Sequence, residues 1–362
     1  MSTPAPGRRG FVRVRAGSQR KENNTSTFKI GNGDEPVLIA KQQGERMIEA
    51  GVKAAVFPGQ GSQRQGMGKD FYDEIPVCRQ TFEEASDALG LDVAAICFEE
   101  DARLHLTEYT QPCLVATETA MLRGLAEKYG WKADCFGGHS LGEFSALVAA
   151  GVMPFADAVR IVRTRGRLMQ EAVPVGAGAM AAIIAEGIDA EAIRTALADL
   201  PVDVANINSA NQVVVSGEAA ALPEAGNRCK ELFSGARPCR VVPLNVSAPF
   251  HSRFMKKIEE PFREALKQVS GAWNVQNAPC VTSNYRGGFH PADADGIANN
   301  LVCQLSSSVL WRDNMQALAF RAGAIYEIGP GRPLRDFFKT VGVTCESVTG
   351  LAAAEKIFAG GS

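Results

Sequence analysis

The sequence has few histidines and no paired cysteine motif. Its 362 residues contain four His, and the nine Cys lie singly, without a CxxC pair. Finger-like spacing is absent, so no metal site is expected. An odd number of scattered cysteines is typical of reduced thiols, which predicts a cytoplasmic protein. No apolar run of about 18 residues occurs, so no membrane span is expected either.

Neither sign of charge predominates. The 38 Lys and Arg residues balance 40 Asp and Glu residues, for a formal net charge of -2, so nucleic acid is not an expected partner. Hydrophobic residues make up 46% of the chain, which excludes disorder of the whole and allows a large core. The length predicts two domains, or one large domain that contains an inserted smaller one.

Residues 1–48 differ from the rest of the chain. They contain little aliphatic periodicity, and five arginines precede the first acidic residue, Glu22. We expect a disordered tail or a linker. An organelle transit peptide is the alternative, because such peptides are also rich in Arg and poor in acidic residues.

The patterned sequence begins with a short apolar run at residues 54–57, which predicts a buried strand. A loop follows in which Gly59 and Gly61 flank Gln60. Glycines there let the backbone approach a ligand and turn its N–H groups outward, although a plain tight turn has the same composition. Helices are predicted over residues 77–89 and 110–129, the second with an apolar stripe that indicates core packing.

Residues 138–142 (GHSLG) fit the G-x-S-x-G pattern of a nucleophile elbow. A short apolar stretch precedes the motif, and residues 144–150 predict a helix that Gly151 ends. The start of that helix directs partial positive charge at the serine. The context therefore predicts Ser140 as a nucleophile.

A serine hydroxyl needs a base. His139 adjoins Ser140 and is expected to point elsewhere, His105 lies in a charged stretch, and His290 is expected in a surface turn. His251 follows a strand-like segment and precedes a helix, a position suited to a base. We favour His251, while each histidine has the alternative of being an ordinary surface or core imidazole.

The fold class is predicted as α/β. Strands and helices alternate in residues 50–176 and 246–345, which indicates a large subdomain with a mainly parallel sheet. Residues 177–245 read as βαββαβ, with Asp189 as a helix N-cap, which predicts an inserted ferredoxin-like small subdomain. We expect the active site in the cleft between the two subdomains.

Several motifs in order give a family resemblance. Residues 57–63 (FPGQGSQ), 138–143 (GHSLGE) and 248–252 (APFHS) resemble those of malonyl-CoA:acyl-carrier-protein transacylases, a family that includes the acyltransferase domains of polyketide synthases. Further matches extend the resemblance over about residues 54–340: 163–166 (RTRG), 208–217 and 327–331 (EIGPG).

The resemblance implies a hydrolase-like large subdomain and ping-pong acyl transfer. Ser140 takes the acyl group from an acyl-CoA, and His251 acts as the base. A backbone carbonyl rather than an Asp orients the histidine, and the corresponding position is Leu310. The backbone N–H groups of Gln60 and Leu141 form the oxyanion hole.

The resemblance also implies the substrate contacts. Arg165 binds the free carboxylate of a malonyl group as a bidentate pair. A solvated charge on a helix is the alternative, since Arg160, Arg163 and Arg167 lie in the same stretch. Phe250 resembles the malonyl-type motif and would crowd an α-methyl group. Asn208 is expected to line the acyl pocket.

Malonyl-CoA and an acyl carrier protein are the expected partners, in fatty acid or polyketide biosynthesis. We expect a monomer without a metal or redox cofactor. An acyltransferase for methylmalonyl or acetyl groups is the first alternative. A serine hydrolase is the second, although no acidic third triad member is evident. A non-catalytic docking module is the third.

Overall fold

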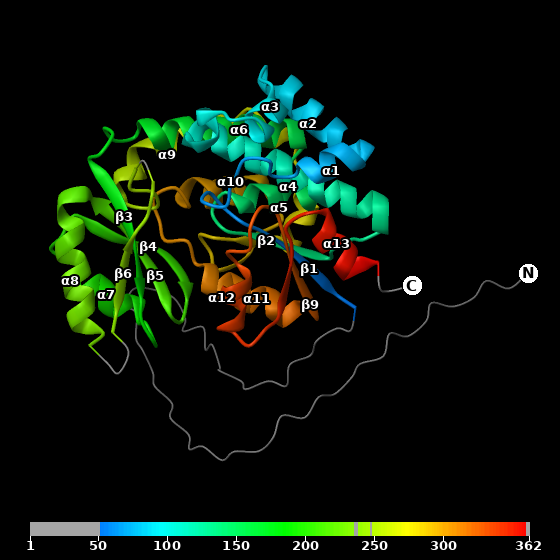
Figure 1. Ribbon diagram of the computed structural model, residues 1–362. Helices are drawn as coiled ribbons and strands as arrows, with labels where there is room; N and C mark the ends of the chain where they lie inside the picture. The colour runs from blue at the N-terminus through cyan, green and yellow to red at the C-terminus, as the bar shows by residue number, and fades with distance from the viewer. Residues whose placement is uncertain (1–50, 235–237, 247, 360–362) are drawn as a thin grey trace, which may run out of the picture.

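The computed structural model describes residues 51–234, 238–246 and 248–359, which form two units, each built on its own sheet (Figure 1). The expected tail at residues 1–48, and its alternative as a transit peptide, lie outside the described residues. The fold class predicted from the sequence is confirmed: a parallel sheet in the large unit and an antiparallel sheet in the small one.

The large sheet has four strands, and each neighbouring pair is parallel. Their order is β10 (Cys345–Val348), β9 (Ala324–Ile328), β1 (Lys53–Phe57), β2 (Cys135–Gly138). Along β1, Ala55 and Phe57 belong to one core cluster and Ala54 and Val56 to another, as side-chain alternation in a strand requires. Both faces of β1 are therefore buried, which explains its unbroken apolar sequence.

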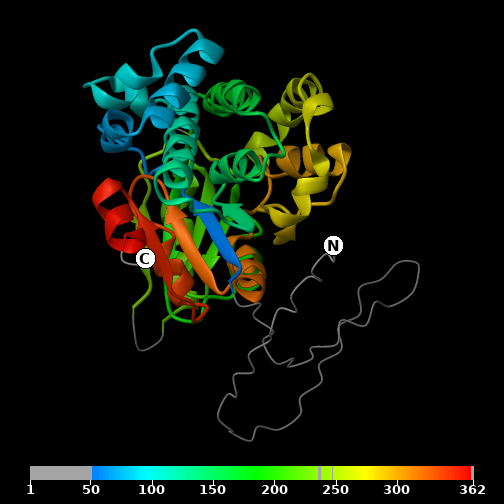
Figure 2. The same cartoon turned by 90° about the vertical axis from the view of Figure 1, so that its right-hand side faces the viewer.

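Helices cover both faces of this sheet (Figure 2). The helices α11 and α12 pack on one face through Trp311, Met315 and Phe338, while α4, α5 and α13 pack on the other. The helices of the large unit are α1 (Lys69–Glu74), α2 (Pro76–Leu89), α3 (Val93–Phe98), α4 (Thr107–Tyr129), α5 (Gly142–Ala149), α6 (Phe155–Glu171), α9 (Glu259–Lys267), α10 (Ala294–Cys303), α11 (Trp311–Arg321), α12 (Arg335–Lys339), α13 (Leu351–Phe358).

The small sheet is antiparallel, in the order β4 (Val202–Ser209), β5 (Gln212–Glu218), β3 (Gly178–Ile184), β6 (Arg240–Pro243). The helices α7 (Ala190–Ala196) and α8 (Leu222–Leu232) follow β3 and β5, which completes the expected βαββαβ order. Asp189 is the N-cap of α7 and accepts the Glu191 N–H at 2.9 Å. Ala181 and Ile183 face the helices, so the alternate residues of β3 face the large unit.

Short elements connect these parts: 3-10 helices Ala102–His105, Ala219–Ala221, Arg253–Ile258, Ser270–Ala272, Val275–Cys280, and strands β7 (Thr282–Ser283) and β8 (Gly288–Phe289). The large unit also continues beyond residue 345, where the sequence placed its end, through β10 and α13. The sequence signal was weak because β10 is an edge strand with only Cys345 and Val348 buried. Among the described helices, none is long and apolar enough to cross a membrane.

Candidate active site

Ser140 occupies a sharp bend between β2 and α5. Its φ of 52° lies in the left-handed region, and within the described residues only His251, at 56°, shares this among non-glycine residues. Such a conformation is costly for a side-chain-bearing residue and is concentrated at functional sites. The bend places Ser140 just before the N-terminus of α5, where the helix dipole favours negative charge.

Glycines allow this bend to pack against the loop after β1. A Cβ on Gly138 would lie 2.0 Å from the Gly142 carbonyl group, and one on Gly142 would lie 2.2 Å from the Phe57 carbonyl oxygen. A Cβ on Gly59 would lie 2.4 Å from the His139 carbonyl oxygen. These contacts show why the motif needs glycine at both flanking positions, and they bring the Gln60 loop beside the serine.

His251 is hydrogen-bonded to the serine. The Ser140 Oγ to His251 Nε2 distance is 2.7 Å, and His251 Nδ1 lies 2.7 Å from the main-chain oxygen of Gln304. Because a carbonyl oxygen only accepts, Nδ1 carries the proton and Nε2 is free to accept one from the serine. Burial, and then the nearby Arg165 charge, lowers the pKa of His251 to about 3.

The family resemblance predicted that the Leu310 carbonyl orients His251. In the structure the Gln304 carbonyl does so instead. The Leu310 carbonyl instead accepts the Asn314 N–H, inside the first turn of α11. Gln304 is the C-cap of α10, where main-chain oxygens lack a partner within the helix. The expectation of main-chain orientation therefore holds, with the residue corrected.

The other histidines have different surroundings. His139 Nε2 lies 2.8 Å from Asn208 Oδ1, so its ring points away from the serine, as expected. His105 is exposed on a 3-10 helix. His290 was expected in a surface turn, but it is buried and bonded to Glu143 Oε1 at 2.8 Å. The sequence around His290 contains glycines and proline, and it did not reveal that a helix covers this turn.

Arg165 is buried beside the serine, with 1% of its surface exposed. Its Nη1 donates to Gln111 Oε1 at 2.9 Å, and its Nη2 donates to Gln304 Oε1 at 2.8 Å and to Ser140 Oγ at 3.1 Å. Within the described residues, its Nε has no partner and no carboxylate forms an ion pair with it. Burial lowers the pKa of Arg165 to about 10, so it keeps its charge at neutral pH.

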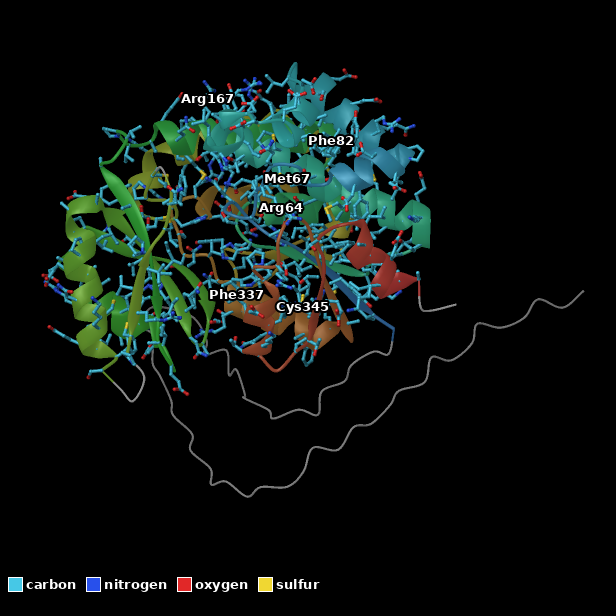
Figure 3. All side chains as sticks on the ribbon, viewed as in Figure 1. Arg64, Met67, Phe82, Arg167, Phe337 and Cys345 are labelled. Carbon is cyan, nitrogen blue, oxygen red and sulfur yellow. The ribbon has the colours of Figure 1, made fainter. Side chains whose placement is uncertain are left out.

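The neighbouring arginines of α6 have other roles. Arg163 pairs with Glu108 at 3.0 Å, and Arg160 pairs with Asp157 at 3.3 Å. Arg167 is exposed at the outer edge of the molecule (Figure 3). The alternative of a solvated charge thus describes Arg167 and is wrong for Arg165, because Arg165 lies on the buried face of α6.

A cavity of about 410 Å³ contains these groups and lies between the two units. Gln60, Ser140 and Arg165 line it from the large unit, as do Phe250 and His251. The small unit contributes the cleft-facing side chains of its sheet: Met180, Ala182, Ile184, Asn206, Asn208, Gln212, Val214. Phe337 of α12 also lines the cavity, at the place where α12 lies beside the small sheet (Figure 3).

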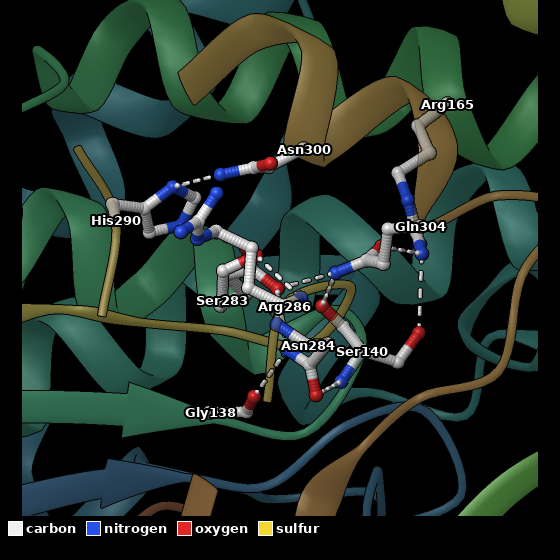
Figure 4. Close-up of polar contacts among 10 residues, drawn as sticks. Gly138, Ser140, Arg165, Ser283, Asn284, Arg286, His290, Asn300 and Gln304 are labelled. Carbon is white, nitrogen blue, oxygen red and sulfur yellow. Dashed lines mark hydrogen bonds and ion pairs between the residues drawn. The ribbon is translucent and has the colours of Figure 1, made fainter. Parts of the chain in front are cut away.

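Four residues of the site were not assigned a role from the sequence: Gln111, Glu143, Asn284 and Gln304. Asn284 accepts the Ser140 N–H at 3.4 Å and donates to the Gly138 carbonyl at 2.8 Å, which clamps both sides of the bend (Figure 4). Amide side chains carry no charge and follow no fixed spacing here, so only Glu143, inside the GHSLGE motif, had a signal in the sequence.

A strained serine after a parallel strand, bonded to an imidazole and facing a buried arginine, defines an α/β enzyme of the serine-dependent acyl-transfer class. Residues 55–317 match the family model described as "Acyl transferase domain". The chain therefore belongs to the acyl transferase domain family.

Relatives of known name agree with this assignment. The chain is 42% identical over 296 residues to the malonyl CoA-acyl carrier protein transacylase of Bacillus subtilis, covering 80% of this chain and 90% of the relative. It is 40% identical over 294 residues to that of Escherichia coli strain K12, covering 80% and 92%. The fold predicted from the resemblance is thus shared with proteins aligned over most of their length.

Solved structures agree as well. The malonyl CoA-acyl carrier protein transacylase from Clostridium perfringens superposes with a TM-score of 0.77 at 33% identity, covering 85% of this chain and 96% of the other. A malonyl-transacylase solved in complex with a type II PKS acyl-carrier protein gives a TM-score of 0.78 at 38% identity, covering 85% and 99%.

Proposed function

We propose that this chain is a malonyl-CoA:acyl-carrier-protein malonyltransferase, which moves a malonyl group from malonyl-CoA to the phosphopantetheine thiol of an acyl carrier protein. The observation that carries the proposal is the buried Arg165 guanidinium, charged, without a carboxylate partner among the residues that the structure describes, and 3.1 Å from Ser140 Oγ. A buried charge held only by neutral oxygens is suited to an anionic ligand. Malonyl has its free carboxylate two carbons from the reacting carbonyl carbon.

The first half-reaction makes an ester on Ser140. His251 Nε2 takes the Oγ proton while Oγ attacks the thioester carbonyl carbon. The Nδ1–H bond to Gln304 O stabilises the imidazolium that forms. The tetrahedral intermediate then expels the CoA thiolate, which takes the proton from His251. The products are malonyl-Ser140 and free CoA.

The second half-reaction reverses these roles. The carrier thiol gives its proton to His251 and attacks the ester carbonyl. The C–O bond breaks and Ser140 Oγ recovers the proton. The reaction needs the malonyl-CoA thioester and the carrier thiol, and no metal or redox cofactor.

The oxyanion is assigned to the Gln60 and Leu141 N–H groups. The Leu141 N–H lies where α5 begins, and Gln60 lines the cavity with its side chain turned to Thr107 Oγ1 at 3.1 Å. Each N–H group of this kind contributes about 3 kcal/mol of transition-state stabilisation.

Two further residues shape the acyl pocket. Phe250, 6% exposed, limits the space for an α-methyl group, and one methyl group contributes about 1–3 kcal/mol to such discrimination. Asn208 holds the His139 ring on the cleft side of the small sheet. Malonyl is therefore the preferred acyl group over methylmalonyl.

The proposal places the enzyme in fatty acid or polyketide biosynthesis, as a cytoplasmic monomer that binds neither nucleic acid nor membrane. All nine cysteines are free thiols in the structure, which suits a reducing compartment. The apolar side chains that line the cavity provide room for the pantetheine arm as well as the acyl group.

Intact-mass measurement of the acylated enzyme tests the proposal. Wild-type protein mixed with malonyl-CoA should gain one malonyl group and lose it to a holo carrier protein, whereas Ser140→Ala should gain none while it remains folded by circular dichroism. Acetyl-CoA and methylmalonyl-CoA in parallel test the choice of acyl group. A malonyl adduct on Ser140→Ala, or loss of the group to water at the rate seen with carrier, would contradict it.

A further inference from the structure

Glu143 is a buried carboxylate that touches none of the reacting atoms. It is fully buried, and four N–H donors converge on it. Its Oε2 accepts from the Asn284 main chain at 2.9 Å, the Asn284 side chain at 2.5 Å and Gln304 Nε2 at 2.7 Å. Its Oε1 accepts from His290 Nε2 at 2.8 Å. A buried carboxylate so fully bonded can hold its partners in one orientation.

His290 completes this arrangement. Its side chain is fully buried, and Asn300 Nδ2 lies 3.3 Å from its Nδ1. Because an amide nitrogen only donates, Nδ1 is the acceptor and Nε2 carries the proton that faces Glu143. His290 is therefore held as a donor to the carboxylate, which leaves the other oxygen of Glu143 for the two amide residues.

Gln304 connects Glu143 to the catalytic groups. Its Nε2 donates to Glu143 Oε2 and to the Ser140 main-chain oxygen at 3.0 Å, while its Oε1 accepts from Arg165 Nη2 at 2.8 Å. An amide turned by 180° would point its NH₂ at the guanidinium and its oxygen at the carboxylate, and both contacts would be repulsive. Because the Glu143 oxygens accept from N–H donors, the Gln304 NH₂ faces the carboxylate, and the Gln304 oxygen therefore faces Arg165.

We propose that Glu143 and His290 are positioning residues that fix the Gln304 amide and thereby aim Arg165 at the carboxylate of the acyl group. This inference rests on the proposed function, because it concerns the arginine that recognises malonyl. The Gln304 main-chain oxygen, which orients His251, does not depend on the direction of the amide. The pair should therefore affect malonyl recognition more than the intrinsic reactivity of Ser140.

Two reactions on Ser140 separate these effects. Acylation by malonyl-CoA uses Arg165, whereas sulfonylation by phenylmethanesulfonyl fluoride uses the serine and histidine without a carboxylate contact. Glu143→Gln should lower the malonyl acylation rate at least tenfold and the sulfonylation rate less than threefold. Glu118→Gln is the matched control: Glu118 is also fully buried, bonds Ser145 at 2.5 Å, and should leave the ratio of the two rates unchanged.

A second pair of variants tests the same role without changing Glu143, so the test does not depend on whether Glu143→Gln folds. His290→Gln retains an N–H donor near the position of Nε2 and should keep malonyl acylation within threefold of wild type. His290→Leu removes the donor and should behave like Glu143→Gln. Equal loss of both reactions in folded variants, or malonyl acylation unchanged in Glu143→Gln and His290→Leu, would overturn the positioning role. Failure of the wild type to accept malonyl at all would overturn the proposed function instead.

Discussion

Under the proposed function, the guanidinium of Arg165 is the residue-scale feature that most constrains the substrate. Its two terminal nitrogens are held by Gln111 and Gln304, and its Nε is buried without a partner among the described residues. A carboxylate that enters the cavity replaces the missing counter-charge. Arginine is suited to this role because its planar group can donate two parallel hydrogen bonds.

Arg165→Ala should lower kcat/KM for malonyl-CoA by about 100-fold, the equivalent of about 3 kcal/mol, because a charge-assisted pair is lost. Acetyl-CoA lacks the carboxylate and should lose less than tenfold. Arg165→Lys, which keeps the charge without the fork, should restore only part of the malonyl rate. Steady-state transfer to a holo carrier measures both substrates. Equal losses for malonyl and acetyl would remove Arg165 from substrate selection.

His251 should make catalysis insensitive to pH across the range in which an ordinary histidine titrates. Burial lowers its pKa from 6.5 to about 3, so Nε2 remains an acceptor between pH 8 and pH 5. We expect kcat/KM for malonyl-CoA to vary less than threefold over this interval. A loss of activity with a midpoint near pH 6.5 would show that His251 has an ordinary pKa.

The same lowered pKa affects stability. Below about pH 6.5 the unfolded chain binds a proton at His251 that the folded chain does not, so the free energy of unfolding is unaffected above pH 6.5 and falls as the pH drops toward 3. The slope from one proton is at most about 1.4 kcal/mol per pH unit. Urea unfolding at pH 7 and pH 5 measures it. His251→Gln should reduce the difference in unfolding free energy between the two pH values. Part of the difference should remain, because burial also lowers the pKa of His139.

At the scale of elements, the bend between β2 and α5 depends on close backbone contact with the end of β1. Gly142→Ala places a Cβ 2.2 Å from the Phe57 carbonyl oxygen, and neither strand nor helix can shift freely. We expect a loss of about 3 kcal/mol in the free energy of unfolding. Gly271→Ala, where no atom lies within 4 Å, should change stability by less than about 0.5 kcal/mol. Thermal and urea unfolding of both variants check this, and similar midpoints would contradict it.

The helices and strands differ in how readily the sequence reveals them. The strand at residues 54–57 and the helix α4 were predicted because each has a continuous apolar pattern. The edge strand β10 was not, because it buries only Cys345 and Val348. The helix expected after His251 is present as the 3-10 segment Arg253–Ile258, which buries Met255 and Ile258. A pattern of burial predicts an element only when enough of its residues face a core.

For the whole molecule, the active site depends on how the small unit sits against the large one. The loop after α10 joins the edge of the small sheet, where the Val309 N–H donates to the Ala205 oxygen at 2.8 Å and the Ile207 N–H to the Val309 oxygen at 2.9 Å. His139 and Asn208 bridge the units inside the cavity. Both units therefore shape the space above Ser140.

Asn208→Ala should weaken this junction. It leaves the part-buried His139 Nε2 without its partner, which costs about 1–3 kcal/mol in the free energy of unfolding. KM for malonyl-CoA should rise several-fold, because the substrate enters between the two units. Asn211→Ala, at the adjacent turn of the small sheet, is the control and should leave KM unchanged. An unaltered KM and midpoint for Asn208→Ala would exclude a role at the junction.

The sequence alone predicted the chemistry of this protein wherever the residues involved are neighbours in the chain. The motif around Ser140 combines strand, bend and helix within a few residues, so its glycine spacing and its apolar flanks predicted a nucleophile. His251 could be favoured among only four histidines, and Arg165 followed from the family motif. The alternation of apolar segments likewise indicated both sheets.

Contacts between segments that lie far apart in the sequence could not be predicted from the sequence. Gln304 lies 53 positions from His251 and 164 from Ser140, and His290 lies 147 from Glu143, yet hydrogen bonds join each pair. Neutral amides and a turn histidine have no periodic pattern that reports their partners. Folding buries them together, and most buried polar atoms form hydrogen bonds, so the orientations of the His251 ring and the Arg165 guanidinium are set only when the end of α10 meets the bend.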